Sequence, residues 1–117
     1  MLWLSMGAFA ASVRLGYIYD QSSASWVVES FSQFKLGVKA VNDAGVLGGG
    51  YRLNYSVCNS EGEALVALRC AASLLDDPDV IGIVGTGYSS AAPLAASFSS
   101  IRQKPMVSPG SNLITLA

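Results

Sequence analysis

The amino-acid sequence predicts an α/β fold, in which a parallel sheet carries helices on both faces. Segments with strand-type and helix-type patterns alternate along the chain, which is typical of such a sheet. One strand segment, 80–85, is almost wholly apolar, as expected for a parallel strand covered on both sides. With 51% hydrophobic and 13% charged residues in a length of 117, the chain suits one packed domain.

The first half of the chain predicts strand, helix, strand and helix. Residues 13–19 are mostly β-branched and aromatic, which indicates a strand, and the alternation over 51–58 indicates another. Apolar residues recur at spacings of three and four over 26–44, which predicts a helix with one buried face. The expected buried stripe is Val27, Phe31, Phe34, Val38 and Val41. Residues 59–63 supply capping side chains and first-turn acids for a second helix that ends at 76–79. Its expected stripe is Ala64, Leu65, Leu68, Ala71, Ala72 and Leu75.

The second half predicts the apolar strand 80–85, a helix over 90–102 and a strand over 105–108. The helix is expected to bury Leu94, Ala95, Phe98 and Ile101. Residues 109–110, Pro-Gly, then turn the chain, and Ser111 and Asn112 are placed to cap a fourth helix that the sequence cuts off. Since the sequence stops soon after the fourth strand, we expect 13–117 to be one incomplete domain with right-handed crossovers.

Residues 1–12 are set apart from this pattern, because the first eleven are apolar and uncharged. Eleven residues are too few for a membrane span, which needs about 20. The Ala-Phe-Ala sequence at 8–10 is similar to a signal-peptidase site, although a basic segment before it is missing. A shortened export signal is therefore the favoured interpretation, and a stray chain end is the alternative.

The composition excludes several classes of function. The net charge is −1 with no cluster of Lys or Arg, so a nucleic-acid partner is not expected. No histidine is present, which removes Ser-His-Asp and Cys-His catalysis and any zinc site that needs imidazole. We therefore expect neither an enzyme nor a cofactor or metal.

The two cysteines, Cys58 and Cys70, allow two interpretations. They are either buried free thiols or one disulfide, and the disulfide would require an oxidising compartment. Cys58 falls at the end of a predicted strand and Cys70 two turns into the next helix. This spacing favours free thiols, because a disulfide needs Cα atoms about 5.5 Å apart.

Candidate chemistry lies in the loops that follow the strands, because ligands of open α/β sheets bind outside the carboxyl ends of the strands. These loops are 20–25, 58–60, 85–90 and 108–112; three of them are rich in Ser, Gly and Asn, and none contains a cation. Hydroxyls, backbone N–H groups and helix N-termini at such loops suit a carboxylate or another small polar group.

The loop 85–90, Gly-Thr-Gly-Tyr-Ser-Ser, has alternative interpretations. As a dinucleotide site it lacks the last glycine of the fingerprint, where Ser90 stands, and the acidic residue about 20 positions later. A purely structural role is also compatible, with Gly85 and Gly87 allowing a tight turn and Ser89 and Ser90 capping a helix. A flavodoxin-like interaction domain without a ligand is the third hypothesis.

Three ordered segments carry a resemblance to a known family. They are 40–49 (AVNDAGVLGG), 81–90 (IGIVG followed by Tyr88-Ser89-Ser90) and 105–111 (PMVSPGS). The sequence from 13 to 117 thereby resembles the type I periplasmic-binding-protein-like family. This family comprises leucine/isoleucine/valine-binding proteins of ABC importers and the receptor ligand-binding regions called ANF-receptor domains.

The resemblance implies a fold of two α/β lobes that close on a ligand, of which this chain holds part of the N-terminal lobe. In amino-acid-binding members, a serine at the second of these segments and a threonine after the third hold the ligand carboxylate. Carried over, these roles fall on Ser90, with Ser89 beside it, and on Ser111 and Asn112. Asn112 stands in place of the threonine; its amide still offers a donor, with a different geometry.

Three further side chains near these loops have two possible roles each. Tyr88 either stacks on the ligand or covers the turn. Core packing is favoured for Trp26 over a place in the cleft, and loop capping is favoured for Asp20 over contact with a ligand ammonium.

The expected function is extracellular or periplasmic binding of a small polar ligand such as an amino acid, together with a second lobe absent from this chain. A receptor ectodomain that signals across a membrane is favoured, because the 51–58 strand ends in Cys-Asn. A dimer partner is a further expectation for a receptor. The alternative is the substrate-binding component of an amino-acid importer, and the alternative of another class is a nucleotide-binding enzyme domain.

Overall fold

The computed structural model describes residues 12–21, 25–87 and 91–108, and they form the predicted alternation of strands and helices. The elements are β1 (Ser12–Tyr19), α2 (Ser25–Ala44), β2 (Arg52–Asn59), α3 (Ala64–Asp76), β3 (Val80–Val84), α4 (Ala92–Ile101) and β4 (Met106–Val107). Residues 1–11 and the fourth helix expected after Asn112 lie outside the described residues.

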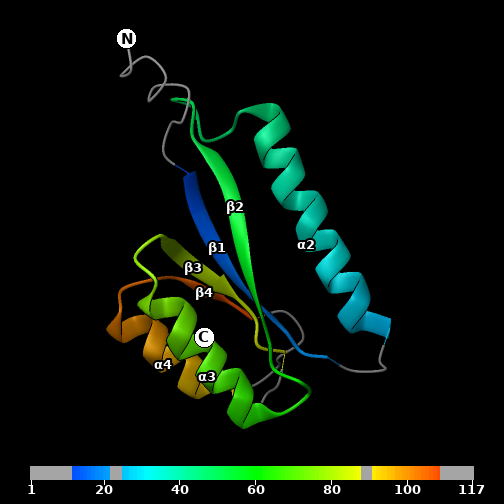
Figure 1. Ribbon diagram of the computed structural model, residues 1–117, viewed down its shortest axis with the longest axis vertical. Helices are drawn as coiled ribbons and strands as arrows, with labels where there is room; N and C mark the ends of the chain where they lie inside the picture. Colours follow the sequence, from blue (N-terminus) through cyan, green and yellow to red (C-terminus); the bar gives the residue numbers. More distant parts are fainter. Residues whose placement is uncertain (1–11, 22–24, 88–90, 109–117) are drawn as a thin grey trace.

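The strands form one parallel sheet in the order β2-β1-β3-β4 (Figure 1). β1 and β2 pair along their whole length, from Ser12 opposite Arg52 to Tyr19 opposite Asn59. β3 pairs with β1 on the other side and with β4 beyond it. The chain therefore leaves β1 toward one edge and later returns to its other side, which confirms the predicted fold class.

Helix α2 lies along β1 and β2 on one face of the sheet (Figure 1). Aromatic side chains make much of this contact. The ring of Tyr17 in β1 lies 4.9 Å from that of Phe31 and 4.6 Å from that of Phe34, between centroids. Tyr55 in β2 makes an edge contact with Phe34 at 5.3 Å. Near the end of α2, the Asn42 amide exchanges two hydrogen bonds, of 2.8 and 2.7 Å, with the backbone of Leu53. These contacts fix α2 against β1 and β2.

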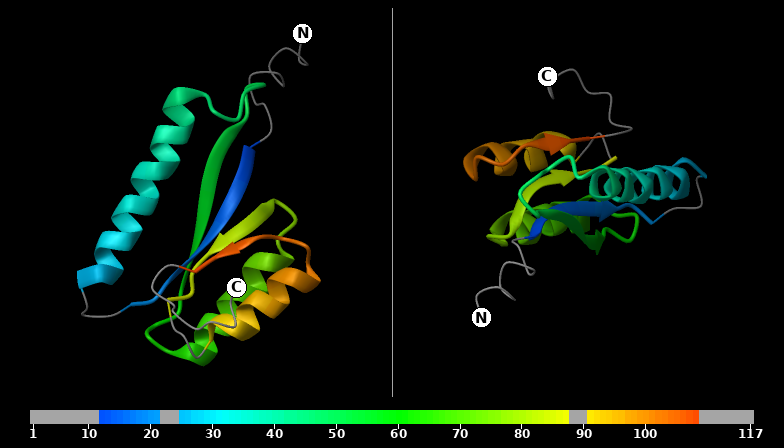
Figure 2. Two further views of the ribbon diagram at one scale, coloured as in Figure 1. Left: turned by 180° about the vertical axis from the view of Figure 1, so that it is seen from behind. Right: turned by 90° about the horizontal axis from the view of Figure 1, so that it is seen from above.

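Helices α3 and α4 lie side by side on the opposite face (Figure 2). Gly16 lets α3 approach β1 closely, because a Cβ atom there would lie 2.9 Å from Leu74 Cδ1 and 3.1 Å from Ile83 Cγ2. The buried cluster on this face is Ile18, Ala67, Cys70, Ala71, Leu74, Leu75, Val80, Ile83, Ala91 and Ala95.

The phase of these two helices differs from the predicted stripes. Leu65, Leu94 and Ile101 were expected in the core but are exposed, whereas Cys70 and Leu74 are buried. In α4 all the buried residues are small (Ala92, Ala95 and Ser99), and in α3 Ala67 and Ala71 are fully buried. Larger apolar residues of α4 are then turned away from the sheet.

The cysteines form a disulfide, so the expectation of free thiols is wrong. Cys58 and Cys70 are bonded, with Cα atoms 5.6 Å apart. The spacing argument failed because α3 folds back over the end of β2, which brings the second turn of the helix above Cys58. The bond joins the edge strand of the sheet to the helix that covers it.

Burial of Tyr17 raises the pKa of its phenol, which makes the stability of the fold depend on pH. Desolvation raises the pKa of this phenol above 10.0, and the nearby charge of Asp20 and the neighbour Tyr19 raise it further. Above about pH 10 the unfolded chain releases the Tyr17 proton, while the folded chain still retains it. The stability that this group contributes below about pH 10 is therefore lost as the pH rises further.

We therefore expect the free energy of unfolding to fall between about pH 8 and about pH 11, and to fall less in Tyr17→Phe. Urea unfolding at the two pH values measures this difference. An equal fall in both proteins would show that other groups are responsible.

Candidate functional site

The sheet has a topological switch point between β1 and β3. β1 is followed by a crossover to β2 on one side, and β3 is followed by a crossover to β4 on the other. In sheets of this kind the ligand crevice lies outside the carboxyl ends of the two strands at the switch point. The described residues at this edge are Asp20, Gln21, Asn59, Ser60, Gly85, Thr86, Gly87 and Ser108.

Asp20 lies at the centre of this edge. Asp20 is only 5% exposed. Its carboxylate accepts hydrogen bonds from three groups in two other loops. The Ser60 hydroxyl donates to Oδ1 over 2.7 Å, and the Gly87 backbone N–H donates to Oδ2 over 2.7 Å. The Thr86 hydroxyl lies 3.1 Å from both oxygens. This arrangement fits the loop-capping role favoured for Asp20.

Further hydrogen bonds join the neighbouring loops. The Ser60 N–H donates to the Tyr19 carbonyl at 2.9 Å, which holds the end of β2 to the end of β1. The Gly85 N–H donates to the Val107 carbonyl at 2.8 Å, and the Ser108 hydroxyl donates to the Thr86 carbonyl. The loops after β1, β2, β3 and β4 thus form one continuous edge.

Gly85 is required by the turn after β3. Its φ of 106° lies in a region that side-chain-bearing residues rarely adopt. A Cβ atom at this position would also lie 3.0 Å from the carbonyl oxygen of Ile18 and 3.1 Å from its Cβ. The glycine lets the β3 turn pass directly over the end of β1.

Trp26, in the first turn of α2, stands beside Gly87. A Cβ atom on Gly87 would lie 2.8 Å from Cη2 of the indole ring. Trp26 is 44% exposed, so the favoured interpretation as a core residue is wrong. The reason is that the first turn of α2 lies at the carboxyl edge of the sheet, where the described neighbours of the ring come from the end of β1, from α2 and from the β3 turn. The cavity between them, about 10 Å³, is too small to be a ligand site by itself.

The sequence-predicted ligand residues Tyr88, Ser89, Ser90, Ser111 and Asn112 lie outside the described residues. The structure places the residues that precede them in the chain, Gly87 and Ser108, at the same edge of the sheet. Sequence reasoning missed that Ser60 and Thr86 are buried and donate hydrogen bonds to the Asp20 carboxylate. A sign of this was present, since each hydroxyl residue comes immediately or shortly after a strand.

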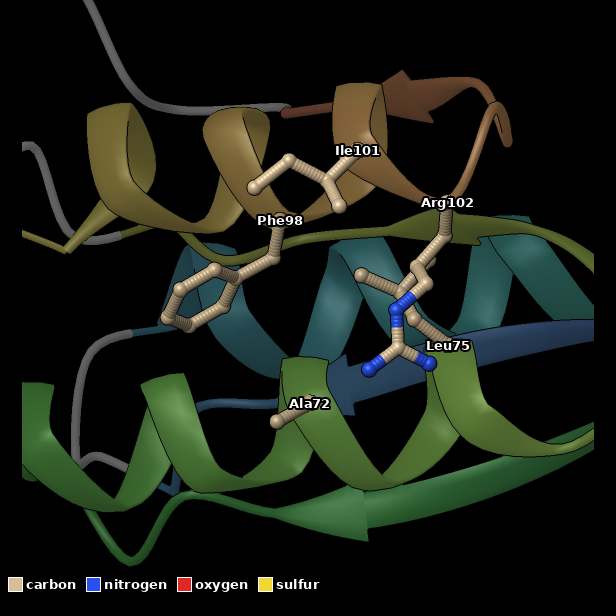
Figure 3. Close-up of a pocket in the computed structure, with 5 residues that line it drawn as sticks. All are labelled: Ala72, Leu75, Phe98, Ile101 and Arg102. Atoms are coloured by element: carbon tan, nitrogen blue, oxygen red, sulfur yellow. The ribbon is translucent and has the colours of Figure 1, made fainter.

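Two larger hollows lie away from this edge. One, of about 150 Å³, is formed between α3 and α4 by Ala72, Leu75, Phe98, Ile101 and Arg102 (Figure 3). Its lining is mainly apolar, and Arg102 is ion-paired with Asp76. The other, of about 390 Å³, is an open groove between α2 and β2 that includes Lys35, Lys39 and Arg52.

The opposite, amino edge of the sheet carries charged contacts with a structural purpose. Arg14 pairs with Asp77 at 3.1 Å. The Lys104 ammonium donates to the carbonyls of Leu75 and Asp77 at 2.9 and 2.8 Å, which closes the C-terminal end of α3. These groups are committed to holding α3, so the carboxyl edge is the stronger candidate for function.

Among residues 12–21, 25–87 and 91–108, no His, Cys, Asp and Glu side chains gather in a group that could hold a metal ion. None of the helices described is both long enough and apolar enough to cross a membrane.

Comparison with known proteins gives one family and a set of similar structures. A model of the family described as the receptor family ligand binding region matches residues 32–116. No curated protein matches the sequence.

Three solved structures share the fold of the described chain. The branched-chain amino acid transporter substrate-binding protein LivJ from Streptococcus pneumoniae, in complex with isoleucine, is 21% identical with a TM-score of 0.78. An ABC transporter substrate-binding protein from Desulfitobacterium hafniense, in complex with Leu, is 23% identical with a TM-score of 0.78. The similarity to each covers 91% of this chain and 31% of the other.

The leucine-binding protein LivK from Thermotoga maritima is 22% identical, with a TM-score of 0.63. That similarity covers 89% of this chain and 29% of LivK. The chain therefore spans about a third of the length of the solved structures that it matches, and it has the fold of part of each.

Proposed function

The chain belongs to the protein family described as the receptor family ligand binding region. We propose that it forms one wall of a cleft that binds an amino acid. The observation that carries the proposal is the meeting of the β3 and β4 turns beside the switch point, which lies between β1 and β3. The Gly85 N–H bond to Val107 and the Ser108 bond to Thr86 hold these two turns together. They are the turns that lead into the segments resembling the family's ligand-carboxylate positions.

In this proposal the ligand carboxylate is bound by the hydroxyls of Ser89, Ser90 and Ser111, the amide of Asn112 and nearby backbone N–H groups. Neutral donors of this kind suit a carboxylate at the start of a helix. Trp26, half-exposed beside Gly87, supplies an apolar surface next to them, and Tyr88 is adjacent in sequence. The residues bind and orient the ligand, and no covalent step is assigned to them.

The solved structures favour the transporter alternative over the receptor ectodomain that the sequence suggested. Two of them are described as transporter substrate-binding proteins and carry isoleucine or leucine. We therefore propose an exported substrate-binding protein for an amino acid as the source of this wall. The disulfide between Cys58 and Cys70 supports export, because such bonds persist in oxidising compartments.

The nucleotide-binding alternative is disfavoured by the contacts of Gly87. In a dinucleotide site the glycine-rich turn offers its backbone N–H groups to the pyrophosphate. Here the Gly87 N–H is bonded to the Asp20 carboxylate at 2.7 Å. This contact removes a donor from the turn and places a negative charge where phosphates would bind.

We expect the isolated chain to bind L-leucine only weakly, with a dissociation constant in the millimolar range. A micromolar constant corresponds to about 8 kcal/mol, and a wall that supplies half of this gives a millimolar constant. Titration of the ¹⁵N-labelled chain by NMR measures such weak binding. The shifts should be confined to Gly85, Thr86, Gly87 and Ser108 and their neighbours, and should disappear in Ser90→Ala.

The control is Ser97→Ala, because Ser97 is exposed in α4 and bonds only to the Pro93 carbonyl among its described contacts. This variant should retain the leucine shifts. Micromolar binding by calorimetry would contradict the assignment of a single wall. Shifts centred on Phe98 and Ile101, or none at millimolar leucine, would contradict the placement of the site.

A further inference from the structure

Asp20 is a buried carboxylate that the proposed ligand contacts do not use. It directly follows β1, the inner strand that lies between β2 and β3. Moving a carboxylate out of water is costly unless it is paired or fully hydrogen-bonded. Among the described residues no cation pairs with it, and its four contacts of 2.7 to 3.1 Å come from Ser60, Thr86 and Gly87.

The two carboxylate oxygens divide these contacts between the flanking loops. Oδ1 accepts from Ser60 in the loop after β2, whereas Oδ2 accepts from the Gly87 N–H in the turn after β3. Thr86 lies between the two oxygens and touches both. Hydrogen bonds to an ionised acceptor are about twice as strong as neutral ones, so this single side chain fixes both loops to the end of β1.

We propose that Asp20 is a positioning residue that sets the place of the Gly85–Gly87 turn, and through it the place of the ligand wall. The second part of this inference rests on the proposed function, whereas the first part does not. Apart from Asp20, the described hydrogen bonds of the turn join it to β4, through Gly85 with Val107 and Ser108 with Thr86. Among the described hydrogen bonds, those of Asp20 thus connect the turn to the β1 and β2 side of the switch point.

The chemistry of the three donors predicts different results for two substitutions. A hydroxyl can donate or accept, so Ser60 and Thr86 can both turn to accept from an amide. A backbone N–H can only donate, so Gly87 requires an oxygen. In Asp20→Asn the amide oxygen can face Gly87 while its NH₂ group faces Ser60, which retains the network. Asp20→Ala leaves the Gly87 N–H without this acceptor.

The experiment compares the ¹⁵N-labelled 117-residue chain with Asp20→Ala, Asp20→Asn and the surface control Asp43→Ala. An N–H bonded to a carboxylate has a downfield proton shift and exchanges slowly. We expect Asp20→Ala to move the Gly87 proton upfield, to speed its exchange by about tenfold or more, and to weaken leucine binding beyond the millimolar range. In Asp20→Asn and Asp43→Ala, the exchange rate of the Gly87 N–H and the dissociation constant for leucine should both stay within about threefold of their values in the original chain.

The outcomes separate this inference from the proposed function. An unchanged Gly87 signal in Asp20→Ala, or Asp20→Asn behaving like Asp20→Ala, overturns the positioning role. If Asp20→Ala moves Gly87 yet binds leucine as before, the link to the ligand wall is wrong. If the original chain fails to bind leucine while Gly87 responds as expected, the proposed function fails and the positioning of the turn stands.

A second measurement covers the case in which Asp20→Ala does not fold. The scalar coupling across the hydrogen bond, between the Gly87 nitrogen and the Asp20 carboxylate carbon, is measured in the unmodified chain. Its detection supports the contact, and its absence overturns the inference.

Discussion

Removal of the disulfide is expected to lower the free energy of unfolding by about 3 kcal/mol. Cys58 and Cys70 are 12 positions apart, and the bond closes a loop of that size in the unfolded chain. Opening the loop returns conformational entropy to the unfolded state, and about 3 kcal/mol is the value for a loop of this length. Guanidinium unfolding of the double variant Cys58→Ala/Cys70→Ala, compared with the original chain, measures the difference.

A reductant provides the matched control for this experiment. Dithiothreitol should destabilise the original chain by a similar amount, because it opens the same loop, and should leave the double variant unchanged. A double variant as stable as the oxidised original would mean that packing of α3, rather than the covalent bond, holds this helix on β2.

The second large effect is expected at Ile83, in the short apolar strand β3. Ile83 is 2% exposed, and its Cγ2 lies against Gly16 in the cluster beneath α3. Ile83→Ala should cost about 3 kcal/mol of stability, from lost burial together with the cavity that remains. Chemical unfolding with an unchanged denaturant slope would identify the change as one of stability.

Ile81 is the natural control, because it is the same residue type in the same strand but is 47% exposed. Ile81→Ala should cost less than about 1 kcal/mol. Equal losses for the two variants would show that β3 is buried on both faces in solution, by a partner or by another copy of the chain.

The fold followed from the sequence because local signals agreed with the final packing. Each strand run was apolar or alternating, and each helix run was bounded by turn residues, so all seven described elements lie where the patterns predicted. The capping side chains expected before α3 were wrong, because its N-cap residue is Glu63, which makes no side-chain capping hydrogen bond. The helix stripe from Val27 to Val38 was correct because α2 packs on the sheet along one line. In α3 and α4 the stripe was less successful, since two helices that also pack on each other divide their small and large residues between two surfaces.

From the sequence, only the location of the candidate site could be predicted, and not its hydrogen-bond network. The rule that ligands bind at the carboxyl ends of parallel strands identified one candidate edge and its loops. It did not indicate the network on Asp20, whose partners are 40 to 67 positions away in sequence. Such contacts depend on the strand order, and no local pattern tells which strands are neighbours. For the same reason, the disulfide and the exposed place of Trp26 required the structure.

The two faces of the sheet are held in different ways. On one face, α3 is covalently bound to β2 and contributes much of the buried cluster. On the other, α2 has no covalent bond to the sheet among its described contacts and buries two residues, Val27 and Val38, beside its half-buried Phe31 and Phe34 rings and the Asn42 contact with Leu53. Regions with less burial open at lower free energy than the core. The two faces of the sheet therefore differ in mechanical resistance. Under an applied force, α2 is expected to detach from the sheet before α3 does.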